Sequence, residues 1–319
     1  MTDGKIIAIV GATGAQGGGL ARAILADPAG GFAVRALTRN PDSAAARALA
    51  AQGAEVVQVD LDDAASVRRA FQGAWGAFCV TNFWEHFSAE REEAQAAHMA
   101  GAAADAGLAH VVWSTLEDVR RFVPLSDPAI PTLQGRYKVP HFDGKGASDR
   151  HFTERGVPTT FVLASYYWDN LVHLGAGPQR GKDGNLVFAL PMADRRLAGI
   201  AAEDIGKCAY GVLRRGPALA GRRIGLAGEH LTGEEMAAAL GRALGEPVAY
   251  RPLSYDEFQA LGFPGADDLA NMFRFFCAFE EPFLGARPVH TARELNPELQ
   301  SFEAWLGTNA SRIPIAPRR

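Results

Sequence analysis

Cysteine is scarce in this sequence: its 319 residues include only Cys79, Cys208 and Cys277. Their spacing fits neither a disulfide framework nor a Cys-x-x-Cys site, and each has apolar neighbours. We therefore expect three reduced core residues in a cytoplasmic protein. No HExxH motif is present and the eight histidines are dispersed, so we expect no metal site.

Long apolar runs and blocks of like charge are also missing. No stretch approaches the roughly 18 consecutive apolar residues of a membrane span. The first residues enter a strand pattern without the apolar region of a signal peptide. Lysine and arginine are scattered, and the formal net charge is −4. A nucleic-acid interface needs clustered basic residues, so we expect neither a nucleic acid nor a membrane as partner.

The first half of the chain alternates short β-type runs with alanine-rich helical runs. This alternation is typical of a parallel sheet whose strands are joined by crossover helices. It predicts an α/β fold with a Rossmann-type, doubly wound sheet of six strands. The strands are expected over residues 5–11, 33–40, 54–60, 76–82, 110–115 and 158–165, and the intervening helices over 43–53, 64–73 and 90–107.

The regular alternation fades in the second half. Thr232 and Glu235 have the spacing of a helix capping box, which predicts a helix that begins there. We expect a Rossmann domain over residues 1–165, with a returning segment near 186–227. A smaller, mostly helical α/β lobe over 166–319 is expected to cover the cleft. Its other elements are a loop over 175–185, strands over 186–191 and 222–228, and helices over 201–216, 254–262, 266–280 and 301–307.

A glycine cluster follows the first expected strand and opens a helix. Gly11, Gly14 and Gly17 have the spacing Gly-x-x-Gly-x-x-Gly. Gly11 permits a tight turn, Gly14 lets the backbone approach a pyrophosphate, and Gly17 allows helix and strand to pack closely. The alternative is a tight turn that holds no ligand. We expect a dinucleotide to contact Gly11, Ala12, Thr13, Gly14, Ala15, Gln16 and Gly17 at the helix start.

The end of the second expected strand indicates which dinucleotide is bound. An NAD site usually has an acidic residue there, whereas this strand ends in Thr-Arg-Asn. Arg39 can pair with a 2′-phosphate through two hydrogen bonds, which predicts NADP(H); the alternative is a solvated surface charge. Asp60 and Leu61 end the third strand, where a side chain can face the adenine. Asp60 can equally cap the helix that starts near Asp63.

Further motifs extend the pattern over nearly the whole chain. They are, in order, GATGAQGGG, TRNP, GAEVVQVDLDD, VTNFWE, HFDGKG and LGFPGADDLANMFRFF. With these motifs the sequence resembles the NmrA-like family, and within it the HSCARG-type proteins, which are atypical relatives of the short-chain dehydrogenases. The resemblance implies a Rossmann domain with a small lobe, a preference for NADP(H) over NAD(H), and redox sensing or regulation through protein contacts. Reductases of small molecules occur among the wider relatives.

The resemblance also implies contacts near the nicotinamide end of the cofactor. It places them at Thr81, Asn82, Phe83, Lys145, Ala164, Ser165, Tyr166 and Tyr167. One departure lies in the helix after VTNFWE, where Ala94 and Ala97 stand in place of an expected lysine that would face the phosphates. This departure predicts somewhat weaker cofactor binding.

The residues for hydride-transfer chemistry are incomplete. Short-chain dehydrogenases use Tyr-x-x-x-Lys and a nearby serine, with the tyrosine donating a proton. Here His141 stands in place of the tyrosine in what reads as a glycine-rich loop, while Lys145 is retained and Ser114 ends the fifth strand. Because histidine ordinarily titrates near neutrality, His141 is a candidate proton donor. The alternatives are a structural histidine, or donation from Tyr166 or Tyr167.

Several functions remain open at this stage. The missing tyrosine favours a protein that senses the NADPH/NADP ratio and acts through a protein partner. Ser114 and Lys145 favour an NADPH-dependent reductase of a small carbonyl, quinone or imine, and a lyase or epimerase with bound cofactor is a third alternative. An oligomer is compatible with each of these functions. The segment LANMFRFF is expected to pack between the lobe and the rest of the chain.

Overall fold

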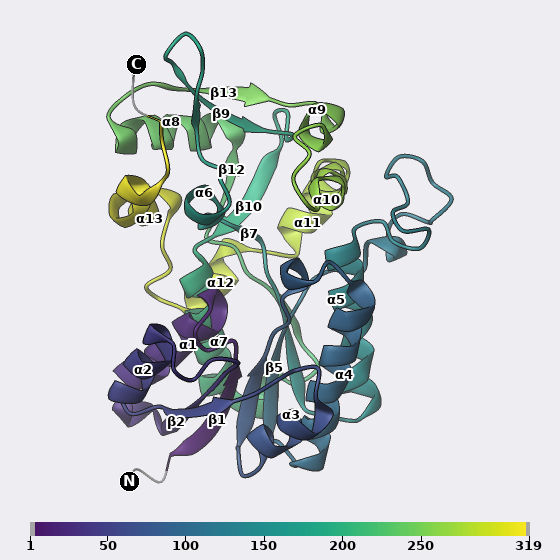
Figure 1. Cartoon of the computed structure of the whole chain (residues 1–319), viewed down its shortest axis with the longest axis vertical. Coiled ribbons are helices and arrows are strands. Elements are labelled where there is room, and N and C mark those ends of the chain that lie inside the picture. The colour runs from purple at the N-terminus through teal and green to yellow at the C-terminus, as the bar shows by residue number, and fades with distance from the viewer. Residues whose placement is uncertain (1–3, 317–319) are drawn as a thin grey trace.

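The computed structural model describes residues 4–316, whose central element is a seven-stranded parallel sheet (Figure 1). Its strand order is β11-β6-β5-β4-β1-β2-β3, so the chain reverses direction across the sheet between β1 and β4. The predicted Rossmann-type sheet with a smaller C-terminal lobe is confirmed, but the expected number of six strands is wrong, because β11 adds a seventh beside β6. The strands are β1 Lys5–Val10, β2 Phe32–Thr38, β3 Glu55–Gln58, β4 Gly76–Cys79, β5 His110–Thr115, β6 Thr159–Leu163 and β11 Arg223–Gly225.

Helices cover both faces of this sheet. Ile7 and Ile9 of β1 belong to the hydrophobic core on one face, and Ala8 and Val10 belong to the core on the other. Because both faces are buried, the strands read as continuous apolar runs. The first face carries α1 Ala15–Ala26, α2 Ala44–Ala51, α7 Ala202–Arg215 and α12 Val289–Leu295; the second carries α3 Ala64–Phe71, α4 Ala89–Asp105 and α5 Pro140–Glu154.

Glycines let α1 and α7 cross with their backbones in contact. A Cβ atom on Gly19 would lie 2.4 Å from the carbonyl oxygen of Glu203, and one on Gly206 would lie 2.3 Å from the backbone nitrogen of Leu20. No larger residue fits at either position without moving a helix. The glycine run at the start of α1 therefore serves helix packing as well as the turn before it.

The lobe is built on two small three-stranded sheets, with orders β12-β10-β7 and β13-β9-β8. The predicted capping box forms at the start of α8: Thr232 accepts from the backbone of Glu235, whose carboxylate accepts from the backbone of Thr232. The strands are β7 Tyr166–Tyr167, β8 Gln179–Arg180, β9 Leu186–Leu190, β10 Arg196–Ile200, β12 Glu229–Thr232 and β13 Val248–Pro252. The helices are α6 Asn170–His173, α8 Gly233–Leu244, α9 Tyr255–Gln259, α10 Ala266–Ala278, α11 Glu280–Gly285 and α13 Phe302–Asn309.

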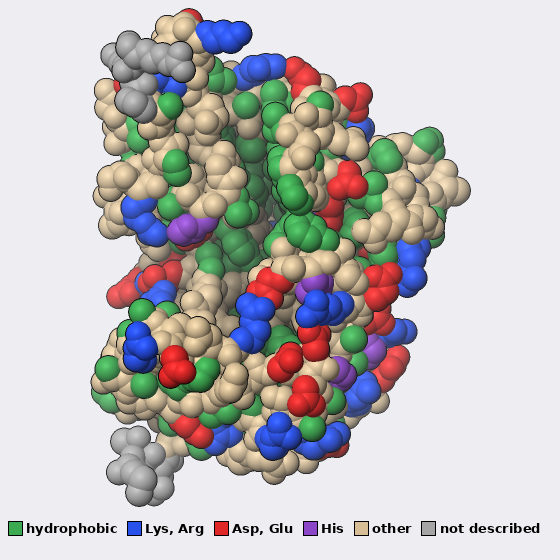
Figure 2. Space-filling view, in the orientation of Figure 1, with side chains coloured by type: hydrophobic (Ala, Val, Ile, Leu, Met, Phe, Trp, Pro, Cys, Tyr) green, Lys and Arg blue, Asp and Glu red, His purple; other side chains and the backbone are tan. Residues whose placement is uncertain are grey.

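Short 3₁₀ helices complete the chain: η1 Pro28–Gly30, η2 Phe83–Glu85, η3 Val119–Arg121, η4 Gly216–Leu219 and η5 Ala310–Arg312. Figure 2 shows a hollow with hydrophobic side chains on its walls, between the part of the lobe that carries α6 and the part that carries α9 and α10. It opens beyond the carboxyl ends of the central strands, the side on which sheets of this type bind ligands.

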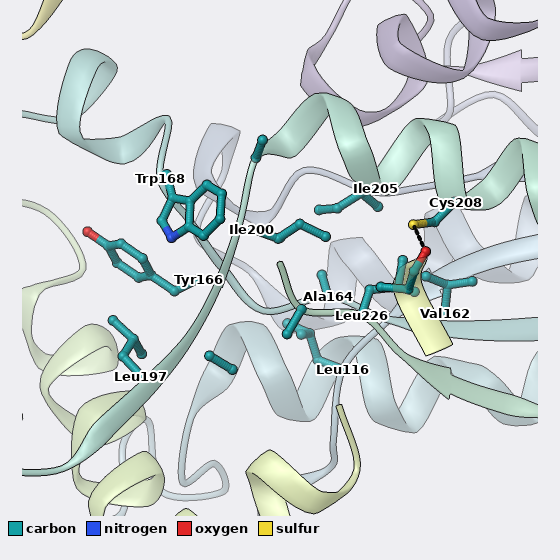
Figure 3. Close-up of a cluster of buried hydrophobic side chains, with 14 of the residues drawn as sticks. Leu116, Val162, Ala164, Tyr166, Trp168, Leu197, Ile200, Ile205, Cys208 and Leu226 are labelled. Carbon is teal, nitrogen blue, oxygen red and sulfur yellow. Dashed lines mark hydrogen bonds between the residues drawn. The ribbon is translucent and has the colours of Figure 1, made fainter. Parts of the chain in front are cut away.

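One continuous core joins the lobe to the central sheet (Figure 3). Val162 of β6 and Leu226 after β11 lie in the same cluster as Ile200 of β10 and Trp168, which is buried. A Cβ atom on Gly199 would lie 2.2 Å from the indole nitrogen of Trp168, so β10 packs directly on this ring. The lobe is therefore packed against the sheet through its own strands.

The remaining composition-based expectations concern cysteines, membranes and metals. All three cysteines are free thiols; Cys79 and Cys208 are buried, and Cys277 is partly buried and packs against the edge of the core. Burial raises the pKa of all three thiols.

No helix within residues 4–316 is long and apolar enough to cross a membrane. The same residues contain no group of three or more His, Cys, Asp or Glu side chains placed to hold a metal ion.

Candidate dinucleotide site

The glycine loop lies at the carboxyl end of β1. Gly11 has a φ of +65°, and its carbonyl accepts a hydrogen bond of 2.8 Å from the backbone of Gly14. A Cβ atom on Gly17 would lie 2.5 Å from the Gly11 oxygen, so the loop and α1 pack as the spacing predicts. Gly14 is the N-cap of α1, and no side chain caps this helix end. Thr13, Gly14 and Ala15 are exposed, so this helix end presents backbone N–H groups and the positive end of the helix dipole, a combination that suits an anion.

Gln16 connects two of the other predicted site residues. The hydroxyl of Ser114, in β5, donates to Gln16 Oε1 at 2.8 Å, and Gln16 Nε2 donates to the hydroxyl of Tyr167, in β7. Burial raises the pKa of Tyr167 to about 12, and the bond from Gln16 acts in the opposite direction. The structure therefore brings these three side chains together beside the glycine loop, an association that the sequence did not reveal.

Arg39 lies just after β2 and has a carboxylate partner that the sequence prediction missed. Its guanidinium donates to both carboxylate oxygens of Glu85, at 2.6 and 2.8 Å. Glu85 ends η2, which follows β4, and its Oε1 also accepts a 2.9 Å bond from the amide of Asn82. The end of β2 carries no acidic residue, as predicted, but the segment VTNFWE after β4 supplies Glu85. Side-chain exposures of 70% for Arg39 and 40% for Glu85 leave both accessible to a ligand.

Asp60 and Leu61 lie beyond the carboxyl end of β3. The Asp60 carboxylate accepts from the backbone of Asp62 at 2.9 Å and remains exposed. The alternative that Asp60 caps the next helix is wrong, because Asp63 is the N-cap of α3 and accepts from the backbone of Ala65. The Asp60 side chain therefore does not cap α3.

His141 and Lys145 lie on a helix, so the prediction of a glycine-rich loop is wrong. Pro140 occupies the first position of α5, where its missing N–H costs no hydrogen bond. The buried carboxylate of Asp143 accepts from the backbone of Val139, and burial raises the pKa of Asp143 to about 6. A Cβ atom on Gly146 would lie 2.4 Å from the backbone nitrogen of Asp118. Glycine is present here because the helix packs against a neighbouring loop.

Lys145 is held in a buried ion pair. Its ammonium lies 2.9 Å from Glu92 Oε1, and it donates to the Thr81 hydroxyl at 2.7 Å and to the Thr81 carbonyl at 2.9 Å. The Thr81 hydroxyl in turn donates to Glu92 at 2.7 Å. Glu92 is fully buried in α4, and its presence was not predicted. The charge of Lys145 is therefore compensated, and its side chain is fixed at the carboxyl end of β4.

His141 joins α5 to the lobe. Its Nδ1 lies 2.5 Å from the carboxylate of Asp268 in α10, and its backbone N–H donates to the same carboxylate at 3.1 Å. The imidazole ring also lies 4.8 Å from the ring of Trp84. Within residues 4–316 it makes no hydrogen bond to Ser114 or Lys145. The three candidate catalytic residues thus occupy separate hydrogen-bond networks.

The segment from β6 to β7 is fixed from the lobe side. The carbonyl of Ala164 accepts two bonds from the guanidinium of Arg287, at 3.0 and 2.9 Å. The hydroxyl of Ser165 donates to the carbonyl of Leu226 at 2.8 Å, and Tyr166 is buried, which raises its pKa. Through these contacts the lobe determines where Tyr167 lies.

Ala94 and Ala97 lie on a different face of α4 from the buried Glu92. Ala94 is exposed, and the two alanines line a shallow surface hollow that also includes Glu90, Glu93, Arg136 and His151. A lysine at position 94 would extend from this outer face. The interpretation that alanine here removes a phosphate contact is therefore not supported by the position of Ala94.

A sequence model of the NmrA-like family matches residues 3–306. The chain belongs to the NmrA-like family. It is 30% identical over 291 residues to an NmrA-like family domain-containing oxidoreductase, FrzB of a Cladobotryum species, with 85% of this chain and 83% of that protein covered.

Solved structures of NmrA, a negative transcriptional regulator, have the same fold. The NAD complex superposes with a TM-score of 0.79 at 26% identity. The NADP complex superposes with a TM-score of 0.77 at 25% identity, and each match covers 96% of this chain and 95% of the other. Proteins similar to this chain thus include an oxidoreductase and a regulator, and the NmrA fold has been solved with both dinucleotides.

Proposed function

We propose that this NmrA-like protein binds NADP(H) and senses the redox state of the NADP pool through contact with a protein partner. The uncapped N-terminus of α1 is the observation that carries cofactor binding, because Thr13, Gly14 and Ala15 leave it exposed. The backbone there would hold the pyrophosphate, and Arg39 would hold the 2′-phosphate. The solved NAD and NADP complexes of NmrA support the binding of a nicotinamide dinucleotide. Asp60 and Leu61 are proposed to lie at the adenine end.

The nicotinamide end is proposed to lie against the residues that close the cleft. They are Thr81, Asn82, Phe83, Lys145, Ala164, Ser165, Tyr166 and Tyr167. The same proposal divides the chain into a cofactor-binding domain over 1–165, with the returning segment near 186–227, and a covering lobe over 166–319. A cytoplasmic location accords with the three free thiols.

The contacts made by the candidate acid, His141, and by Lys145 favour sensing over catalysis. Lys145 is paired with Glu92, and His141 is paired with Asp268 of the lobe, so the two side chains are held by separate partners and not by one another. The segment η2 contacts both parts of the protein, since the Trp84 ring packs at a tilt against His141 and lies 2.8 Å from the position of a Cβ on Gly265. Cofactor bound beside Asn82 and Phe83 can therefore alter a contact with the lobe.

If the protein is a sensor, NADPH should slow backbone hydrogen exchange in residues 83–87 and 263–268 together. Phe87 has a positive φ of 54°, and its ring lies 3.2 Å from the Cβ position on Gly265, so the two segments are in contact. Hydrogen–deuterium exchange followed by mass spectrometry across an NADPH titration measures the effect. A ligand shifts a conformational equilibrium only through differential affinity, so the change should saturate with occupancy. Slower exchange confined to residues 11–17 would contradict a signal to the lobe.

An NADPH-dependent reductase of a small carbonyl, quinone or imine is the second candidate, and one observation favours it. The oxygen of Tyr167 accepts from Gln16, whose own oxygen accepts from Ser114, so the Tyr167 proton is not used in this network. That proton is available to the oxygen of a substrate bound beside Tyr167. NADPH, when bound, would supply the hydride.

For the reductase candidate we expect Tyr167→Phe to lower turnover about 10²- to 10⁴-fold, the usual cost of losing a general acid. The affinity for NADPH should stay within about threefold, because the phenyl ring is retained. NADPH oxidation with a panel of carbonyls and quinones measures turnover, and calorimetry measures binding. Tyr210→Phe is the matched control, since Tyr210 lies in α7 and bonds to Asp27. Normal turnover in Tyr167→Phe together with its loss in His141→Asn would identify His141 as the donor.

A further inference from the structure

The Arg39–Glu85 ion pair occupies the group that a 2′-phosphate would need. The two terminal guanidinium nitrogens of Arg39, Nη1 and Nη2, are bonded to Glu85 at 2.6 and 2.8 Å. The carboxylate is oriented by the amide of Asn82, and the Arg39 carbonyl accepts a 3.2 Å bond from Gln58. The pair is thus built from β2, the end of β3 and η2. It lies at the strand edge where the proposed cofactor has its adenosine ribose.

Glu85 takes the Nη1–Nη2 edge of the Arg39 guanidinium, so a phosphate bound at that edge must displace the carboxylate, and one bound at the Nε edge would lie beside its negative charge. A phosphate and a carboxylate each accept two parallel N–H bonds from the planar fork, and placing the two anions side by side is unfavourable. Because the side chains of Arg39 and Glu85 are exposed, their pairing is weak enough for a phosphate to displace it. NADH has a hydroxyl at this position and needs no such displacement.

We propose that Glu85 sets the cofactor preference of this protein by competing with the 2′-phosphate for Arg39. Glu85 therefore keeps the preference for NADPH over NADH smaller than Arg39 alone would produce. This inference rests on the proposed function, since it requires NADP(H) at the glycine loop. The sequence alone located the choice between NADPH and NADH at the end of β2. This inference adds Glu85, in η2, as a second residue that determines the choice.

Calorimetric titration of the full chain with NADPH and with NADH tests this role. We expect Glu85→Gln to lower the Kd for NADPH about three- to tenfold, while the Kd for NADH changes less than about twofold. Most of the gain should disappear when the same substitution is made in an Arg39→Gln background, because no guanidinium remains to be released. The double-mutant cycle isolates the pair from effects of either side chain alone.

Glu55→Gln is the matched control. Glu55 pairs with Arg35 at 2.7 Å, at the start of β3, so its replacement changes the net charge equally at the other end of the same strands. It should leave both dissociation constants unchanged. Unchanged or weaker NADPH binding in Glu85→Gln, or an equal gain for NADH, would overturn the role of Glu85. Failure of the unsubstituted protein to bind either dinucleotide would instead contradict the proposed function itself.

Discussion

Gly14→Val is expected to weaken NADPH binding at least about 100-fold while leaving the fold intact. Gly14 has φ −94° and ψ −172°, a backbone conformation open to any residue. An added Cβ would lie 3.2 Å from the Gly11 oxygen, which is a tight but tolerable contact. The rest of the valine side chain would fill the exposed space before the first turn of α1. That is the space a pyrophosphate must enter, so the effect is steric.

Calorimetry measures the loss of binding, and thermal unfolding followed by circular dichroism shows whether the fold is kept. Gly307→Val is the matched control, since a Cβ on Gly307 in α13 meets nothing within 4 Å. Gly11→Ala provides a contrast, because a φ of +65° should make it lower the stability as well as the affinity. Near-normal NADPH affinity in Gly14→Val would show that the loop is a structural turn only.

Local patterns in the sequence were sufficient to predict the strands of the central sheet and the glycine loop. The first six strands of the central sheet are mostly apolar runs, and the loop from Gly11 to Gly17 is defined by its own backbone, so short-range spacing describes both. The pairs Arg39–Glu85 and His141–Asp268 are different, because their members lie 46 and 127 positions apart. No local spacing contains that information, since the fold alone brings these side chains together.

Other differences between the predicted and the observed elements arise where packing overrides local propensity. Gly146 lowers the helix propensity of its segment, yet the segment forms a helix. The glycine is needed there because a larger residue would collide with Asp118. The lobe strands β10, β12 and β13 were not predicted, and each has only four or five residues. Strand β13 ends in Pro252, a residue that usually marks the limit of a strand. These strands form because partners elsewhere in the lobe complete their sheets.

Arg287 is expected to be the most sensitive single residue for stability. It is fully buried after α11, and its guanidinium donates to both carboxylate oxygens of Glu117 at 2.6 and 2.8 Å, as well as to the Ala164 carbonyl. The guanidinium also lies 3.7 Å from the ring centroid of Phe283. This one side chain joins the end of α11 to the loop after β5 and to the end of β6.

Arg287→Met should therefore lower the free energy of unfolding by about 3–5 kcal/mol, because it leaves the largely buried Glu117 carboxylate and the Ala164 carbonyl without their partner. Urea denaturation measures the change. Arg242→Met is the matched control: its pair with Glu303 is exposed, so its loss should cost at most about 1 kcal/mol. The cause is an unpaired buried charge, so adding Glu117→Leu to Arg287→Met should recover part of the stability. A double variant less stable than Arg287→Met would show that the pair holds the interface by its shape and not through its charge.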